Sequence, residues 1–303
     1  MESKKILVVG SSNTDMVIKT QNFPAPGETI LGGRFLMNAG GKGANQAVAA
    51  ARLGGLVTFV GKIGDDIFGK QAVQQLEDEG INIDYVSVDS ENPSGVAMIT
   101  VDQKGENSIV VAQGSNGTLS PRDFDKAQTE LNESEFVLMQ LETPIPTVEY
   151  IALKAFQKQK KVVLNPAPAA KLSDELLHNL YLITPNETEA ELLTGVKVTD
   201  ESSALKAAFV LHKKGVDIVI ITMGSAGAFL LENGKSEIIK APKVVAVDTT
   251  AAGDTFNGAL VVALSEGKTI RESIIFANQA ASISVTRIGA QSSVPYRKEI
   301  SNQ

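Results

Sequence analysis

The 303-residue chain has 28 Lys and Arg against 35 Asp and Glu, which gives a formal net charge of -7 at pH 7. This acidic balance provides no general attraction to phosphate backbones or anionic membranes, so we expect neither nucleic acid nor membrane as a partner. Hydrophobic residues make up 43% of the chain and charged residues 21%, which excludes a largely disordered protein and allows one large α/β unit. Cysteine is absent, which excludes disulfides and thiolate metal sites.

The N-terminal stretch MESKKILVVG contains an apolar run that is too short to span a membrane, and it lacks the pattern of a signal-peptide cleavage site. We therefore expect a cytoplasmic protein. The two histidines, His178 and His212, lie in polar helical stretches and are expected at the surface. A histidine-based metal site is not predicted.

From residue 4 onward, short apolar runs alternate with helical patterns. The runs are apolar on successive residues, as in strands that are covered on both faces. Between two of them lies GKGANQAVAAARLGG, in which Ala44, Ala47 and Val48 share one helical face and glycines end the helix. The alternation predicts a three-layer α/β/α core around a mostly parallel sheet. The predicted strands lie in KILVVG, VTFVGKIG, EFVLMQLE, KVVLNPAP, YLITPNE and DIVIITMG.

Two segments interrupt this alternation. Residues 13–38 show no helical period, and residues 94–113 read as a hairpin around the turn DQKGE. Both are apolar on two sides, so we expect them to pair as a small sheet that closes over a ligand and also meets a second copy. The predicted domains are a core of residues 1–12, 39–93 and 114–303, and a β-sheet lid and dimer contact of residues 13–38 and 94–113.

The stretch AVDTTAAGDTFNGAL places an aspartate in the first turn of a predicted helix. VVAV, residues 244–247, predicts a strand before it, and the residues after Asp254 repeat at helical spacing. Free amides in the turn of small residues would form an anion site. Asp254 either caps this helix or takes the proton of an acceptor hydroxyl while the amides hold a migrating phosphoryl group.

Two polar stretches indicate a sugar site. In GGKGANQ, glycines lead into a helix that begins with Lys42 and Asn45, and SNTD places Asn13 and Asp15 just after the first strand. These four side chains could together hold vicinal hydroxyls. The alternative is a tight turn with solvated polar side chains.

Two further stretches suit a nucleotide. In TPNETEAE, the spacing of Asn186 and Glu189 fits a helix-capping box, and the same pair could hold hydrated Mg²⁺ beside phosphates. TMGSAGAF, residues 222–229, is a glycine-rich loop between two strands, where it forms either a simple turn or a seat for a nucleotide. The P-loop pattern GxxxxGK[ST] is absent.

In this order and spacing, the motifs resemble the PfkB-type sugar kinases, also called the ribokinase family, over nearly the whole chain. GGKGANQAVAAARLGGLVTFVGKIG is similar to the first family signature, DTTAAGDTF to the second, and Asn186 to Glu189 to the metal-linked N-x-x-E motif. GSSNTD, MQLE, LNPAPA and TRIGAQSSVP are most similar to the members that act on ribose. The resemblance implies a ribokinase-like fold and ATP-dependent phosphorylation of D-ribose at its 5-hydroxyl.

The resemblance also implies roles for single residues. Asp254 would be the catalytic base, and Ala252 and Gly253 would belong to the anion hole. Ribose would contact Asn13, Asp15, Gly41, Lys42, Asn45, Glu142 and Asp254. The nucleotide would contact Asn186, Thr222, Gly224, Ser225, Gly227, Gly253 and Asn278, with Glu189 acting on Mg²⁺ through water.

The members of this family that act on ribose also bind an activating monovalent cation, usually K⁺, and form homodimers through their lids. The resemblance implies both for this chain. Many relatives have an aliphatic residue in place of Thr250 and alanine in place of Ser284, which ligation by backbone carbonyls would tolerate. The implied cation site comprises Asp248, Thr250, Ser284, Arg287, Gly289 and Ser293.

Two alternatives remain on the sequence alone. The first is a related kinase that acts on fructose, a nucleoside or a phosphorylated sugar. The lid offers only Lys19, Arg34 and Lys104 for a phosphosugar, and its short polar set favours a small polyol over a nucleoside. The second is a sugar-binding or regulatory protein without catalysis, which the presence of Asp254 and Gly253 argues against.

Overall fold

The computed structural model describes residues 4–31 and 33–300. Its larger sheet has nine strands, and each of the six runs predicted as core strands contributes one. The strands are β1 (Lys5–Val9), β4 (Leu56–Gly64), β5 (Asn82–Asp89), β8 (Phe136–Met139), β9 (Lys161–Leu164), β10 (Leu182–Ile183), β11 (Ile218–Thr222), β12 (Ala228–Glu232) and β13 (Lys235–Ile239).

The order of this sheet is β13-β12-β11-β10-β9-β8-β1-β4-β5. All neighbouring strands pair in parallel except β12, which runs antiparallel to both β11 and β13. Parallel strands end at one edge, so the carboxyl ends of β1, β8, β9, β10 and β11 meet there. The prediction of a mostly parallel sheet is confirmed.

Helices cover both faces of the sheet, and each face has its own apolar cluster. One cluster includes residues of α1 (Lys42–Arg52), α2 (Ile67–Asp78), α9 (Ala252–Ser265), α10 (Ile270–Ser284) and α11 (Arg297–Ile300). The other includes residues of α3 (Pro121–Asp125), α4 (Gln128–Glu133), α5 (Ile145–Gln157), α6 (Asp174–His178), α7 (Glu187–Thr194) and α8 (Glu201–Lys213). The three-layer core is therefore confirmed. None of the helices in the described ranges is long and apolar enough to cross a membrane.

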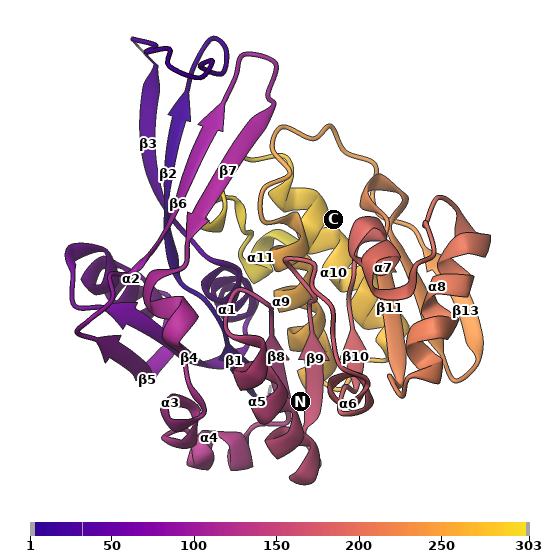
Figure 1. Cartoon of the computed structure of the whole chain (residues 1–303). Helices are drawn as coiled ribbons and strands as arrows, with labels where there is room; N and C mark the ends of the chain where they lie inside the picture. Colours follow the sequence, from indigo (N-terminus) through magenta and orange to yellow (C-terminus); the bar gives the residue numbers. More distant parts are fainter. Residues whose placement is uncertain (1–3, 32, 301–303) are drawn as a thin grey trace.

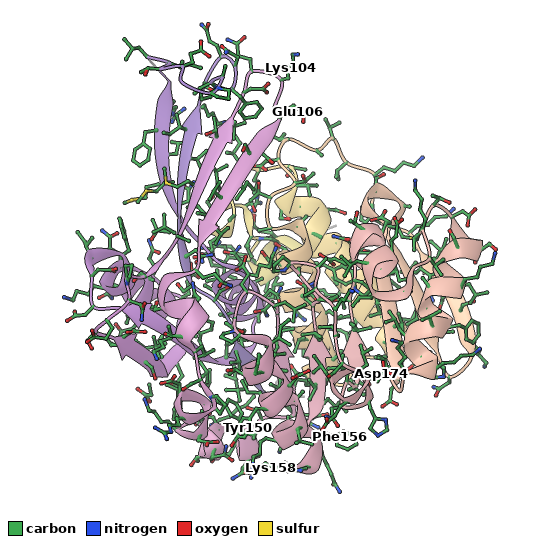
Figure 2. The ribbon with its side chains drawn as sticks, in the orientation of Figure 1. Lys104, Glu106, Tyr150, Phe156, Lys158 and Asp174 are labelled. Atoms are coloured by element: carbon green, nitrogen blue, oxygen red, sulfur yellow. The ribbon has the colours of Figure 1, made fainter. Side chains whose placement is uncertain are left out.

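A second sheet of four strands stands away from the core (Figure 1). Its strands are β3 (Arg34–Gly40), β2 (Asn13–Lys19), β6 (Gly95–Val101) and β7 (Asn107–Ala112), in that order across the sheet. The two segments predicted to pair do so through β2 and β6, which run parallel. Figure 2 shows Lys104 and Glu106 at the far end of this sheet.

Residues 244–247 do not form the predicted strand. Val245 is 85% exposed, and the amides of Val247 and Asp248 both donate to the carbonyl of Val285, at 2.7 and 3.2 Å. The segment passes over the end of α10 and pairs with no strand of the described chain. The β-branched residues of VVAV indicated a strand, but this composition does not form one without a partner strand.

The histidine prediction is correct for His178, which is exposed. His212 is only half-exposed, because its ring Nδ1 lies 2.9 Å from the carbonyl oxygen of Val216. Within the described residues, no three His, Asp or Glu side chains cluster closely enough to hold a metal ion.

Candidate active site

The first turn of α9 opens onto a cavity of about 820 Å³. Ala251 precedes the helix in the left-handed conformation, with φ 57°, and Asp254 is the third helical residue and is buried. The amide of Ala252 donates to the carbonyl of Thr249 at 3.2 Å, whereas first-turn amides such as those of Gly253 and Asp254 lack intrahelical acceptors. A Cβ atom at Gly253 would meet nothing within 4 Å, so an anion can approach this turn closely.

The cavity brings together all the residues expected to bind the nucleotide. They come from the ends of β10 and β11, from the glycine-rich loop with the 3₁₀ turn η2 (Gly224–Ala226), and from α9 and α10. The lining includes Asn186, Thr222, Gly224, Ser225, Gly227, Gly253 and Asn278, together with Lys42, Glu189, Ala252 and Asp254. Residues that are more than 200 positions apart in the sequence thus surround one space.

Two side-chain amides hold the carboxylate of Asp254. Nδ2 of Asn45 donates to its Oδ2 at 2.9 Å, and Nε2 of Gln46 donates to its Oδ1 at 2.9 Å. Oδ1 of Asn45 is buried and has no hydrogen-bond partner in the part of the chain that the structure describes, which leaves an acceptor free beside Asp254. Sequence reasoning selected Asn45 and missed Gln46, although both lie in the same motif.

Glu142 links the end of β8 to the start of α1. Its Oε2 accepts hydrogen bonds from Oγ of Ser11 at 2.5 Å and from the amide of Lys42 at 2.9 Å. Gly41 precedes the helix with φ 88°, and a Cβ there would lie 2.7 Å from the amide nitrogen of Asn13. Only glycine therefore allows the predicted sugar residues of the two stretches to come this close.

Asn116, which sequence reasoning missed, fixes the start of β2. It accepts from the amide of Ser12 at 2.9 Å and donates to the carbonyl of Ser12 at 3.0 Å and to Oδ1 of Asn13 at 2.8 Å. Asp15 lies further along β2, and a Cβ at Gly40 would meet its carboxylate at 2.3 Å. All the predicted sugar residues therefore lie around β2, α1 and Asp254.

Several carboxylates surround one lysine in this region. Burial and the charges of Glu142 and Asp254 raise the pKa of Asp15 to about 7, although Lys42 opposes this shift. Burial lowers the pKa of Lys42, but the attraction of Asp254, Glu142 and Glu189 outweighs it and the net pKa is raised. Lys42 is therefore a permanent positive charge beside the cavity.

The predicted capping box of Asn186 and Glu189 is present at the start of α7. Oδ1 of Asn186 accepts from the amide of Glu189, and Oε2 of Glu189 accepts from the amide of Asn186, each at 2.8 Å. Burial raises the pKa of Glu189, although its hydrogen bond from Asn186 and the charge of Lys42 lower it. The cap occupies only Oε2, so Oε1 can still accept from the water shell of Mg²⁺.

Asp248 joins two segments of the predicted cation site. Its Oδ1 accepts from the amide of Thr250 and its Oδ2 from the amide of Gly289, each at 2.9 Å. Burial raises the pKa of Asp248, but hydrogen bonds from the side chain of Thr250 and from these two amides together lower it more. In the second segment, the amide of Arg287 donates to the carbonyl of Ser284 at 3.0 Å, and Oγ of Ser293 donates to the carbonyl of Ala290 at 2.8 Å.

The sequence of this chain matches the model of the pfkB family carbohydrate kinases over residues 3–297. The chain belongs to this family. It is 52% identical to a ribokinase of Haemophilus influenzae over 98% of this chain and 97% of that protein. It is also 39% identical to a deoxyribokinase of Salmonella typhi, over 96% of this chain and 95% of that protein.

Among solved structures, this family member is similar to Arabidopsis thaliana ribokinase complexed with ribose and ATP. The TM-score is 0.93 at 34% identity, and the match covers 100% of this chain and 98% of that chain. This chain is therefore an ATP-dependent sugar kinase, and the cavity beside α9 is the candidate site of its reaction.

Proposed function

We propose that this sugar kinase transfers the γ-phosphoryl group of ATP to the 5-hydroxyl of D-ribose and forms ribose 5-phosphate and ADP. The observation that carries the proposal is the position of Asp254. Its carboxylate lies at the first turn of α9, where it lines the cavity of the nucleotide residues and accepts a hydrogen bond from Asn45 of the predicted sugar set. Relatives named ribokinase at up to 52% identity support ribose as the acceptor.

In the proposed reaction, the 5-hydroxyl of ribose donates its proton to Asp254. The hydroxyl oxygen bonds to the γ-phosphorus as the bond from this phosphorus to the bridging oxygen of ADP breaks, and the proton reaches Asp254 late in this step. Charge on the migrating group is stabilised by the amides of Gly253 and Asp254 and by the Lys42 ammonium. Asp254 needs little basicity, because the transition state is loose and the proton moves late.

Asn186 and Glu189 would hold Mg²⁺ through its water shell, and the bound ion supplies positive charge to the phosphate oxygens. Asp248 and backbone carbonyls of Thr250, Ser284, Arg287, Gly289 and Ser293 would hold K⁺ beside the anion turn. The small sheet would close over ribose and exclude water, which would otherwise accept the phosphoryl group.

A coupled ADP assay with ribose, 2-deoxyribose, fructose and adenosine, each with and without K⁺, tests this proposal. We expect the highest kcat/KM with ribose and a faster reaction with K⁺. A preference for another acceptor would reassign the enzyme within its family. Ribose binding without any ADP formation would instead indicate a protein that has lost catalysis.

A further inference from the structure

A chain of buried amide side chains connects the ends of the central strands to Asp254. Gln46, on α1, has no exposed surface. Its Nε2 donates to Oδ1 of Asn165 at 3.0 Å and to Oδ1 of Asp254 at 2.9 Å, and its Oε1 accepts from Nε2 of Gln140 at 2.7 Å. Gln46 and Gln140 are 0% and 1% exposed, and the amide nitrogen of Gln46 already donates to two partners, so direct contact with sugar or nucleotide does not explain them.

The orientation of these amides follows from one backbone group. Nδ2 of Asn165 donates to the carbonyl oxygen of Thr184 at 3.2 Å, and a carbonyl oxygen can only accept. Oδ1 of Asn165 must therefore face Gln46, which in turn must present its NH₂ group. The same NH₂ group also faces Oδ1 of Asp254. This oxygen therefore meets an N–H donor in every orientation of the amides that satisfies their hydrogen bonds.

A second set of hydrogen bonds connects the turn at the start of α9 to the end of β10. Oγ1 of Thr184 donates to Oδ1 of Asn257 at 2.6 Å, and Nδ2 of Asn257 donates to the carbonyl of Gly253 at 2.8 Å. Thr184 thus connects both the carboxylate of Asp254 and the turn that begins α9 to the rigid sheet. Buried amide networks of this kind hold one geometry because each broken hydrogen bond leaves an unsatisfied polar group.

We propose that Gln46 is a positioning residue that fixes the rotation of the catalytic carboxylate, and that Gln140 and Asn165 hold Gln46 in place. This inference rests on the proposed role of Asp254 as the base. The amides of Asn45 and Gln46 approach different oxygens of Asp254, so the carboxylate plane cannot turn freely. Each oxygen retains a lone pair, and one of them accepts the proton of the sugar hydroxyl.

The variant Gln46→Glu tests this role, because it keeps the size of the side chain and replaces the donor with a carboxylate oxygen. We expect kcat to fall about 100-fold, as for a misplaced reacting group. The ribose KM should stay within about threefold of the wild-type value, because Gln46 has no exposed surface with which to contact the sugar.

Gln74→Glu is the matched control. Gln74 is an exposed helical glutamine whose Nε2 also donates to carboxylates, at 3.4 Å to Glu77 and 3.0 Å to Asp78. It lies on α2, outside the site, and its variant should retain the wild-type kcat. The comparison separates loss of the donor to Asp254 from a general effect of added charge.

A folded Gln46→Glu variant with kcat within about threefold of wild type would overturn the inference. So would a ribose KM that rises about tenfold or more together with the fall in kcat, because that result indicates general distortion of the site. If this variant does not fold, Gln140→Met decides, since within residues 4–31 and 33–300 the side chain of Gln140 makes a single hydrogen bond, to Gln46. We expect kcat to fall about tenfold at constant ribose KM, and an unchanged kcat would overturn the inference.

The wild-type protein is assayed first. Failure to phosphorylate ribose would contradict the proposed function by itself. The Gln46 and Gln140 variants would then be compared on the sugar that the wild-type protein accepts, so the two results remain distinct.

Discussion

The carboxyl group of Asp15 lies among negative charges and still belongs to the proposed sugar site. Its pKa of about 7 means that the folded protein without sugar retains a proton there between about pH 4 and 7, whereas the unfolded chain releases it near pH 3.8. A sugar hydroxyl that donates to the ionised carboxylate would displace this proton. Asp15 therefore couples sugar binding to pH in the neutral range.

Substitution of Asp15 by Asn tests this coupling. Because the folded state binds the extra proton, Asp15 makes the free energy of unfolding fall as the pH rises from about 4 to 7. In thermal unfolding without sugar, the wild-type Tm should therefore decline relative to that of Asp15→Asn across this range. Parallel Tm curves for the two proteins would show that Asp15 does not carry the raised pKa.

At the scale of elements, the start of α7 combines a structural role with the proposed Mg²⁺ role. Glu189→Gln should separate them, because a glutamine oxygen can still accept from the amide of Asn186. We expect the variant to keep its Tm and to need about tenfold more Mg²⁺ for half-maximal activity, because the negative charge is lost.

The capping box of α10 provides the control. Thr269 and Glu272 form the same arrangement, with Oε2 of Glu272 accepting from the amide of Thr269 at 2.9 Å. Glu272→Gln should leave the Mg²⁺ dependence unchanged. An equal Mg²⁺ requirement in Glu189→Gln and wild type would exclude the metal role.

The elements themselves were largely readable from the sequence. Apolar runs flanked by Gly, Pro or Asn located the buried strands, and small residues located the start of α9. VVAV failed because strand formation needs a neighbouring strand, which local composition does not report. Gln46 and Asn116 were missed because their partners, Asp254 and Ser12, lie more than 100 positions away in the chain.

At the scale of the molecule, one face of the small sheet carries large apolar side chains that no element of the described chain covers. Met37, Met16, Met98 and Val110 are directly paired across the four strands, so they lie on the same face. Met98 is 49% exposed and Val110 68% exposed. A second copy of the chain would bury this face, so the homodimer remains a proposal that this face can test.

Met98→Glu tests the predicted dimer. A charge at the centre of the paired face should convert the protein to a monomer in light scattering after size-exclusion chromatography. Phe156→Glu is the control, because Phe156 is 47% exposed and lies at the end of the molecule opposite the small sheet (Figure 2). A wild-type monomer, or a Met98→Glu dimer of unchanged stability, would contradict the proposed interface.

The fold class was predictable as a whole because alternating strands and helices admit few arrangements. The family resemblance also supplied the proposed site residues. The sequence did not show that the carboxylate of Asp254 is bound by two amides or that Asp15 shares its surroundings with Glu142. Both facts depend on the approach of α1 to α9 and β2.

The role of Asp254 as the base is tested most directly by comparing kcat for ribose in Asp254→Asn and wild type, with ribose binding measured by calorimetry. The account predicts a loss of about 10³-fold in kcat, while ribose still binds. A kcat within tenfold of the wild-type value, in a variant that binds ribose and ATP normally, would contradict it.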